Sequence, residues 1–511
     1  MKLGFLGKAT VLYAIGNICL RAASFLLIPI YAHFLSVEDY GLLMTLLLSI
    51  QFMLVVMNCG TEHSVVRFAK HYEENGQLNC LMGTTFVVSL ISSLIVFCVC
   101  LTLLIPFFRL VLHHQDVYLL IVFTLSSALF QSWCDLLAGY YRSQHQPIKY
   151  TVVGICTALM LTLLSFVFLY ILEMGVKGAL LARFITLGWI FSIIAWQIYS
   201  KTGFRISFKL VPKLLHFGVP LTISSFGLFA ITGVSIYFLS FLTGLESVAV
   251  FSLGQKLAAV LLMVLVLPFQ MSFQPFVFSQ LDSPDIKKQM SRLLSYLAWS
   301  VMAGSYCVLF GARLLLPLIA PPEYADAYLV TLLMMPGMAF LGIFYYGETL
   351  LKTIQKSYII GLIVIVSAVF SIIANFILVN YFSWYGALLA SNATLFILGG
   401  SLFMIGLKEY PLPIEWPRLG IGAVLFVGVL VMNLLLLKSN LYLYCTAQLI
   451  VATVILFVAF RSSLLDEREK QFTRQTLSRL VVLLKRTPRE ESGEISRPEF
   501  SDENREPVKT Y

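Results

Sequence analysis

The chain has 511 residues, of which 59% are apolar and 12% are charged, and its formal net charge is +9. Its apolar runs repeatedly exceed the roughly 20 residues that a helix needs to cross a bilayer. They are also too long for barrel strands, so backbone groups in lipid must be satisfied by helices. The composition excludes a soluble globular protein and predicts an all-α polytopic membrane protein. The cations stand mostly in short loops, where they set membrane orientation, so no nucleic-acid role is predicted.

Apolar runs bounded by charged or Gly/Pro-containing turns predict about fourteen transmembrane helices. The first six fall near residues 9–34, 41–64, 81–107, 117–140, 151–172 and 176–198. The next six fall near residues 214–242, 247–272, 293–319, 327–350, 357–381 and 384–406. The last two fall near residues 418–437 and 440–460. No small-residue cleavage site follows the basic start, so we expect the first run to be a span and not a signal peptide.

An internal repeat divides the first 410 residues or so into two halves. The sequence Gly-Ala-Leu-Leu-Ala at Gly178–Ala182 recurs at Gly386–Ala390, an offset of 208 residues. The same offset aligns further identical residues: Glu38 with Glu246, Phe68 with Phe276, Tyr150 with Tyr358 and Thr186 with Thr394. Six spans per half is an even number, so the two six-helix repeats should be parallel, as in transporters whose bundles rock around a midplane site.

This organisation predicts five parts of the chain. They are an N-terminal six-helix bundle (1–200), a cytoplasmic linker (201–213), a second six-helix bundle (214–410), two additional spans (411–460) and a cytoplasmic tail (461–511). The tail begins with an amphipathic basic stretch that suits a membrane surface and ends in a polar, disordered segment.

Positive charge is distributed unevenly between the two sets of alternate loops. One set holds seventeen Lys and Arg residues before the tail, and the other holds only Arg109, Lys177, Arg313 and Lys438. Because cytoplasmic loops retain positive charge, both termini are predicted to be cytoplasmic.

Three cations lie inside predicted spans, where ionisable groups are costly and are functional candidates. They are Arg21 in the first span, Arg183 in the sixth and Lys256 in the eighth. If they face the space between the bundles, they form a cationic cavity that favours an anionic ligand such as a phosphate or pyrophosphate. The alternative is that each cation reaches an interface or pairs with a neighbouring carbonyl.

Other polar residues and two prolines in or near the spans are further candidates for a functional role. Asp135, in the fourth span, either pairs with a buried cation or binds a coupling proton or sodium ion. Glu62 and Arg67 flank the end of the second span and are gate contacts or plain anchors. Pro220 and Pro268 allow bends within spans and suggest a kinked gate.

Polar amides within the spans either line a cavity or hydrogen-bond between helices. They are Asn17, Gln51, Asn58, Gln270, Gln274, Asn375 and Asn392. The nine cysteines lack metal-ligand spacing, so no metal site is predicted. No phosphate loop follows a strand and no external loop is large enough for a catalytic region, so we expect neither a cofactor nor an enzyme.

The segment Pro29–Gly41, with the sequence Pro-Ile-Tyr-Ala-His-Phe-Leu-Ser-Val-Glu-Asp-Tyr-Gly, is followed by Gly60 and Arg67. The second half contains Phe217–Leu221, Phe-Gly-Val-Pro-Leu, and Gly244–Ala249, Gly-Leu-Glu-Ser-Val-Ala. In these motifs the chain resembles polysaccharide flippases of the MOP (multidrug/oligosaccharidyl-lipid/polysaccharide) exporter superfamily, in particular Wzx-type O-antigen and capsule-repeat flippases.

The resemblance covers about residues 3–460 and implies alternating access in the bacterial cytoplasmic membrane. The implied substrate is an undecaprenyl-diphosphate-linked oligosaccharide, turned from the cytoplasmic to the external face. A cationic midplane would accept the diphosphate, polar groups the sugar, and lipid between the bundles the prenyl tail. The implied partners are membrane lipids and proteins of polysaccharide polymerisation and assembly.

Three other functions remain open. A peptidoglycan-precursor flippase would share the architecture. A cation-coupled small-molecule exporter would carry acidic residues at its binding site, because its typical ligands are cations. A non-transporting scaffold of a polysaccharide assembly complex would dock through the basic tail, residues 464–511.

Overall fold

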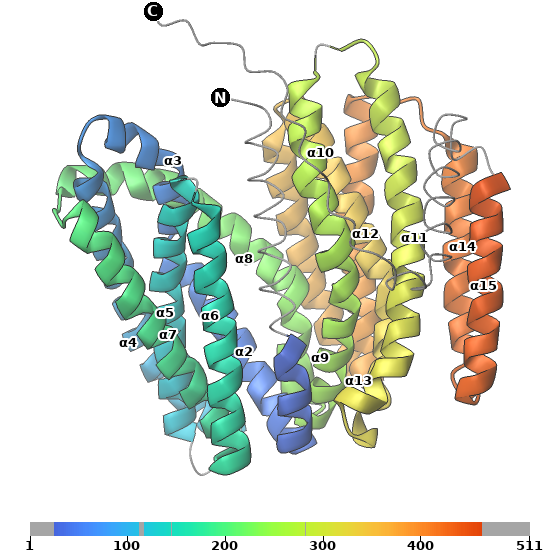
Figure 1. Ribbon diagram of the computed structural model, residues 1–511, viewed down its shortest axis with the longest axis horizontal. Helices are drawn as coiled ribbons and strands as arrows, with labels where there is room; N and C mark the ends of the chain where they lie inside the picture. The colour runs from blue at the N-terminus through green and yellow to red at the C-terminus, as the bar shows by residue number, and fades with distance from the viewer. Residues whose placement is uncertain (1–24, 112–116, 145, 282, 462–511) are drawn as a thin grey trace, which may run out of the picture. The chain divides into compact units, whose positions relative to one another are not determined.

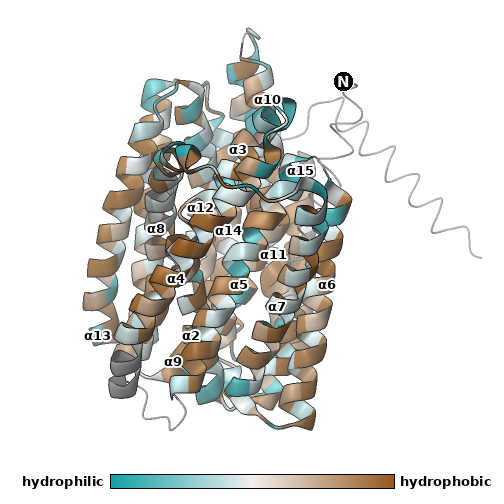
Figure 2. Ribbon diagram, turned by 90° about the vertical axis from the view of Figure 1, so that its left-hand side faces the viewer, coloured by the Kyte–Doolittle hydropathy of each residue, from teal (hydrophilic) through white to brown (hydrophobic). Residues whose placement is uncertain are grey.

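The computed structural model describes residues 25–111, 117–144, 146–281 and 283–461. All regular secondary structure in these residues is helical (Figure 1). Within the described residues, twelve helical segments are long and apolar enough to cross a membrane. Apolar residues predominate along the helices, and hydrophilic residues gather towards their ends (Figure 2). The predicted all-α, polytopic fold is therefore confirmed.

The described helices of the first half begin with Phe25–Phe34. They continue as α2 (Val37–Asn58), α3 (Thr61–Glu74), α4 (Leu78–Val111), α5 (Val117–Ser143), α6 (Pro147–Phe166) with the π-helical turn η1 (Val167–Ile171), and α7 (Gly175–Thr202). The second half contains η2 (Phe208–Leu210), α8 (Val211–Leu242), α9 (Leu245–Leu261), the π-helical turn η3 (Leu262–Val266), α10 (Leu267–Ser279), α11 (Ile286–Ile319), η4 (Pro322–Tyr324), α12 (Ala327–Thr353) and α13 (Ser357–Glu409). The chain continues as α14 (Trp416–Leu435) and α15 (Leu441–Arg461).

Helix α13 contains two membrane crossings. Its 53 residues would measure about 80 Å as one straight helix, against a hydrocarbon core of roughly 30 Å. The helix bends at Ser383, where φ is 52° and ψ is −134°. Lys356, just before α13, donates to the Glu409 carboxylate at its far end over 2.5 Å, so the two ends return to the same place. The bend lies between predicted spans 357–381 and 384–406.

With α13 counted as two crossings, the described residues contain thirteen candidate crossings, and helix Phe25–Phe34 is the described part of predicted span 9–34. The predicted second span, 41–64, ends earlier than expected. Cys59 (φ 44°) and Gly60 (φ 67°) both adopt the left-handed conformation, which ends α2 and starts α3 as a separate helix. Ser36 caps the start of α2 by accepting from the Asp39 N–H over 3.1 Å.

Each half is organised around its fourth predicted span. Helix α5 packs against α2, α3, α4 and α7, and helix α12 packs against α9, α11 and α13. Helices α4–α7 stand side by side, as do α9–α13 (Figure 1). Helix α2 also packs against α8 and α9, so it connects the halves. The predicted domain bounds stay a prediction.

Helix α8 contacts both halves along its length. Near its start, the Ser64 hydroxyl of α3 donates to the Leu214 carbonyl over 3.4 Å. Further along, the Ser371 hydroxyl of α13 donates to the Ala230 carbonyl over 3.3 Å. Pro220 lies between these two contacts. Because proline removes one helical hydrogen bond, α8 has a natural bending point between its two packing partners.

Candidate functional site

A polar pocket of about 210 Å³ lies between helices of the two halves, where α2, α3 and α5 meet α8. Its polar lining residues are Gln51, Asn58, Glu62, His63, Asp135, Thr222 and Ser225. Four of these, Gln51, Asn58, Glu62 and Asp135, are site residues predicted from the sequence. The fold therefore brings together polar groups from the second and fourth predicted spans.

Two of the lining side chains are held by α5. The Asn58 Oδ1 atom accepts from the Ser132 hydroxyl over 2.5 Å. Glu62, at the start of α3, forms an ion pair with Arg142, near the end of α5. These contacts orient the amide and the carboxylate from one rigid helix, which fixes one wall of the pocket.

Asp135 also lines a second cavity of about 310 Å³, between α5, α6 and α7. Within it, the Gln131 Nε2 atom donates to the Asp135 Oδ1 atom over 2.9 Å. The Arg183 Nη2 atom donates to the Gln131 Oε1 atom over 3.4 Å. Gln131 therefore bridges the cation to the acid, and Asp135 is the side chain shared by the two cavities.

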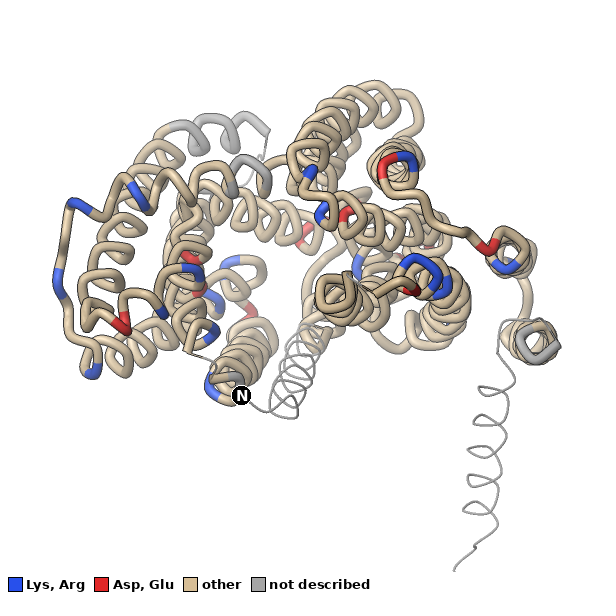
Figure 3. Tube along the Cα trace, turned by 90° about the horizontal axis from the view of Figure 1, so that it is seen from above, with Lys and Arg blue, Asp and Glu red and all other residues tan. Residues whose placement is uncertain are grey.

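Lys256 occupies a different place, where α9 packs against α2. Its Nζ atom lies 2.8 Å from the Met44 Sδ atom and 3.5 Å from the Tyr40 hydroxyl. It also lies 5.5 Å from the centre of the Tyr40 ring. Charged residues are sparse along the described helices (Figure 3), and neither Lys256 nor Arg183 forms an ion pair with another described residue.

Gln270 belongs to a corresponding contact in the second half. Its Nε2 atom donates to the Glu348 carboxylate of α12 over 3.2 Å, and Glu348 pairs with Lys352 at 2.9 Å. Gln270 lies 208 residues after Glu62, the offset of the repeat. Both residues are thus bound to the fourth span of their own half, which supports the internal repeat at the level of side-chain contacts.

Two predicted amides make contacts between or within helices. Asn392 of α13 accepts from the Gly337 N–H over 2.7 Å and donates to the Leu333 carbonyl over 2.9 Å. It thereby bridges backbone groups of α12 beside Pro336, where the helix carries a proline. Asn375 is buried and donates to the Ser371 carbonyl of its own helix over 2.8 Å.

The remaining predicted residues lie at helix ends or outside the described range. The Arg67 guanidinium lies 5.1 Å from the Phe217 ring of α8, close to Pro220 in the chain. Pro268 follows η3, so a π-helical turn precedes the residue that lacks an N–H donor. Arg21 and Asn17 lie outside the described residues. Gln274 is on α10.

Several site residues were not predicted from the sequence. They are His63, Gln131, Ser132, Arg142, Thr222 and Ser225. One signal was available, because Gln131 and Asp135 are four residues apart and therefore share a helix face. Within the described part of the chain, no group of three or more His, Cys, Asp or Glu residues is placed to hold a metal ion.

Comparison with solved structures identifies the fold. An inward-facing multidrug resistance MATE family transporter of the MOP superfamily has a TM-score of 0.62 and 15% identity, covering 78% of this chain and 99% of its own. A MOP superfamily transporter from Pyrococcus furiosus, described as having a binding pocket of reversed polarity, has a TM-score of 0.56 and 15% identity, with coverages of 79% and 95%. A Vibrio cholerae MATE transporter has a TM-score of 0.53 and 17% identity, with coverages of 79% and 96%.

Comparison by sequence identifies the family. No curated protein matches the chain. The family model described as polysaccharide biosynthesis protein matches residues 6–282, which is more than half of the chain. The predicted resemblance is therefore confirmed: the chain belongs to the polysaccharide biosynthesis protein family, and its fold is similar to that of MOP superfamily transporters.

Proposed function

We propose that the protein is a flippase that moves undecaprenyl-diphosphate-linked oligosaccharide repeat units across the bacterial cytoplasmic membrane by alternating access. The units would serve cell-surface polysaccharide synthesis, and both termini would face the cytoplasm. The family and the fold support a membrane transporter of polysaccharide biosynthesis. The family resemblance implies the lipid-linked oligosaccharide, and the charges of the site support its diphosphate group.

One observation carries the proposal. Arg183 and Lys256 are half-buried in membrane-spanning helices, and neither has a carboxylate partner among the described residues. A charged side chain within a span is costly unless a counter-charge or water offsets it. An anionic substrate group supplies that counter-charge during transport, and a diphosphate offers several oxygen acceptors for it.

Asp135 has a separate proposed role. It lies between the two cavities and is linked to Arg183 through Gln131. We infer that its carboxylate takes up a coupling proton or sodium ion, or becomes the partner of Arg183 when no substrate is bound. In either role, Asp135 makes the net charge in one cavity depend on what is bound in the other cavity.

The proposal is tested by measuring lipid-linked oligosaccharide and its sidedness in cells depleted of the protein. Depleted cells complemented with Lys256→Met or Arg183→Met are expected to accumulate diphosphate-linked sugar on the cytoplasmic face. Loss of one charge-assisted contact of roughly 1.5–3 kcal/mol corresponds to a slowing of about 10-fold to 100-fold. Lys438→Met, at an exposed turn, is the control and should behave as the wild type at equal expression.

If depletion causes no accumulation of lipid-linked sugar on either face, the flippase proposal fails. A second candidate is then a cation-coupled small-molecule exporter. It is favoured by one observation: the pocket between the halves is lined by the two carboxylates Glu62 and Asp135 and by no Lys or Arg. An exporter of cationic compounds predicts that Asp135→Asn abolishes drug resistance without changing lipid-linked sugar.

A further inference from the structure

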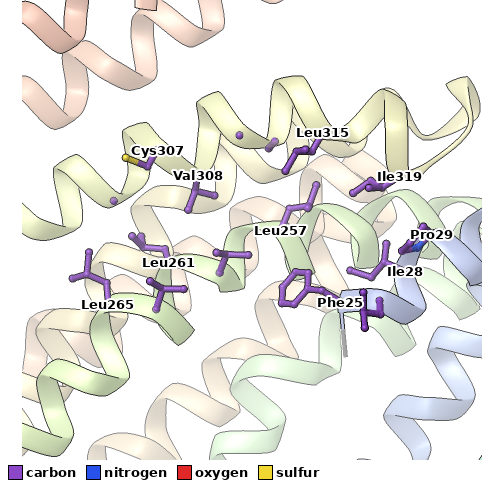
Figure 4. A pocket seen from close by; sticks show the side chains of 16 residues that line it. Phe25, Ile28, Pro29, Leu257, Leu261, Leu265, Cys307, Val308, Leu315 and Ile319 are labelled. Carbon is purple, nitrogen blue, oxygen red and sulfur yellow. The ribbon is translucent and has the colours of Figure 1, made fainter. Parts of the chain in front are cut away.

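An apolar groove of about 530 Å³ lies between helix Phe25–Phe34, the continuous stretch α9–η3, and α11 (Figure 4). All 16 lining residues are apolar side chains, cysteine or glycine. The polar pocket described above shares no lining residue with this groove. The groove is thus a separate feature of the fold, with the chemistry of a hydrocarbon site.

The groove is long. Along α11 its lining extends from Gly304 to Ile319, which is about 22 Å of helix. This length is about three quarters of the roughly 30 Å hydrocarbon core of a bilayer. Leu265 and Cys307 lie towards one end, and Pro29 and Ile319 lie at the other (Figure 4). A linear hydrocarbon fits this shape better than a compact ligand.

Glycine keeps the groove open. A Cβ atom at Gly304 would lie 2.7 Å from the Leu261 Cδ1 atom, so a side chain there would displace the opposite wall. A Cβ atom at Gly311 would meet no atom within 4 Å. The space beside Gly311 is therefore free for a ligand, and a larger side chain there would enter the groove without disturbing the packing.

A lysine, Lys256, immediately precedes a groove-lining residue in the sequence. Leu257 lines the groove, and the preceding residue of α9, Lys256, turns towards Tyr40 and Met44 of α2. One helix therefore presents an apolar face to the groove and an ammonium group to the contact between the halves. A ligand with an anionic head and a hydrocarbon tail matches both faces.

We propose that this groove holds part of the polyprenyl tail of the lipid-linked substrate while its diphosphate is bound at Lys256. The inference rests on the proposed function for the identity of the substrate. It differs from the expectation that the tail stays in bulk lipid, because it gives the tail a defined surface on α9 and α11. The substrate would then be recognised by its tail as well as by its head.

Charge favours this groove over another apolar cavity of about 290 Å³, lined by residues of α11, α12, α13 and α14. The cation next to that cavity's lining, Arg418, is paired with Glu415 at 2.6 Å. An already neutralised cation offers little to an anionic head group. Lys256 has no such partner among the described residues.

The test is photo-crosslinking of the full chain, reconstituted in phospholipid nanodiscs, with an undecaprenyl diphosphate that carries a diazirine in its isoprenoid chain. Mass spectrometry should find cross-links concentrated on residues 257–265 and 304–319. Gly311→Leu should reduce them about tenfold, the effect of displacing roughly two methylene groups from the groove. The matched control is Gly428→Leu on α14, where an added Cβ atom also meets nothing within 4 Å.

Three outcomes would overturn the inference: cross-links spread evenly over the lipid-facing helices, cross-links concentrated on residues 419–426, or equal labelling by a diazirine phospholipid without diphosphate. The wild-type map does not depend on how any variant folds. The experiments distinguish a wrong assignment of the groove from a wrong proposed function. Unchanged flipping by Gly311→Leu in the sidedness assay would reject the groove alone, whereas specific cross-links in a protein whose depletion traps no lipid-linked sugar would reject flipping alone.

Discussion

At the level of single residues, the close approach of the α2–α3 junction to α8 depends on glycine. Gly60 adopts φ 67°, and a Cβ atom there would lie 2.4 Å from the Gly218 Cα atom. We expect Gly60→Ala to lower the thermal stability of the purified protein more than Gly76→Ala does. Gly76 has a similar φ of 64° but nothing within 4 Å of an added Cβ atom.

Both variants share the left-handed backbone cost of about 1–2 kcal/mol, so the difference between them measures the contact, expected to be about 1–3 kcal/mol. Fluorescence-detected thermal unfolding in detergent provides the comparison. Equal shifts in the unfolding temperature would mean that the approach of α3 to α8 does not contribute to stability.

The sequence predicted which residues are candidates for the site better than it predicted which residues they contact. Asp135, Asn58 and Glu62 were predicted because polar groups are rare and costly in apolar spans. Their partners could not be predicted, because packing decides them: Ser132 reaches Asn58 over 74 positions of sequence. Lys256 reaches Tyr40 over 216 positions in the same way, and no local pattern encodes such a contact.

At the scale of elements, α8 is the helix whose mechanics the structure makes testable. Pro220 lies between the contact of Leu214 with α3 and the contact of Ala230 with α13. We expect Pro220→Ala to slow the proposed transport of lipid-linked oligosaccharide severalfold while expression is retained, because restoring the helical hydrogen bond stiffens the bend.

The control for this prediction is Pro275→Ala, a proline inside α10 that lines neither the groove nor the polar pocket. Transport rates at matched expression in the sidedness assay make the comparison. If the two variants transport equally well, the bend in α8 does not limit the conformational change.

The apolar runs predicted that the transmembrane helices exist. They did not predict where a helix breaks within a run. The separation of α2 from α3 depends on left-handed backbone at Cys59, a residue type with no special preference for that conformation. The apolar run around Ser383 was too long for one crossing, so the sequence predicted two spans there. The observed bend at Ser383 lies between them. The π-helical turn η3 had no sequence signal apart from Pro268, which follows it.

For the whole molecule, the two crossings of α13 and the basic loops together predict the orientation of the chain in the membrane. The Lys356–Glu409 contact brings both ends of α13 together, and Ser383 marks the turn between its two crossings. The distribution of Lys and Arg predicts that Lys356 faces the cytoplasm. Ser383 should therefore face the external side, one membrane thickness away.

A membrane-impermeant maleimide tests this arrangement. In intact cells it should label Ser383→Cys, and it should label Gln355→Cys only after permeabilisation. The wild-type chain, with its own cysteines, gives the background. Labelling of both variants from one side would contradict two crossings in α13, and labelling with the sides exchanged would reverse the predicted orientation. The expected labelling would place the basic loops on the cytoplasmic face. Substrate made in the cytoplasm would then meet that face first, which defines the direction of the proposed transport.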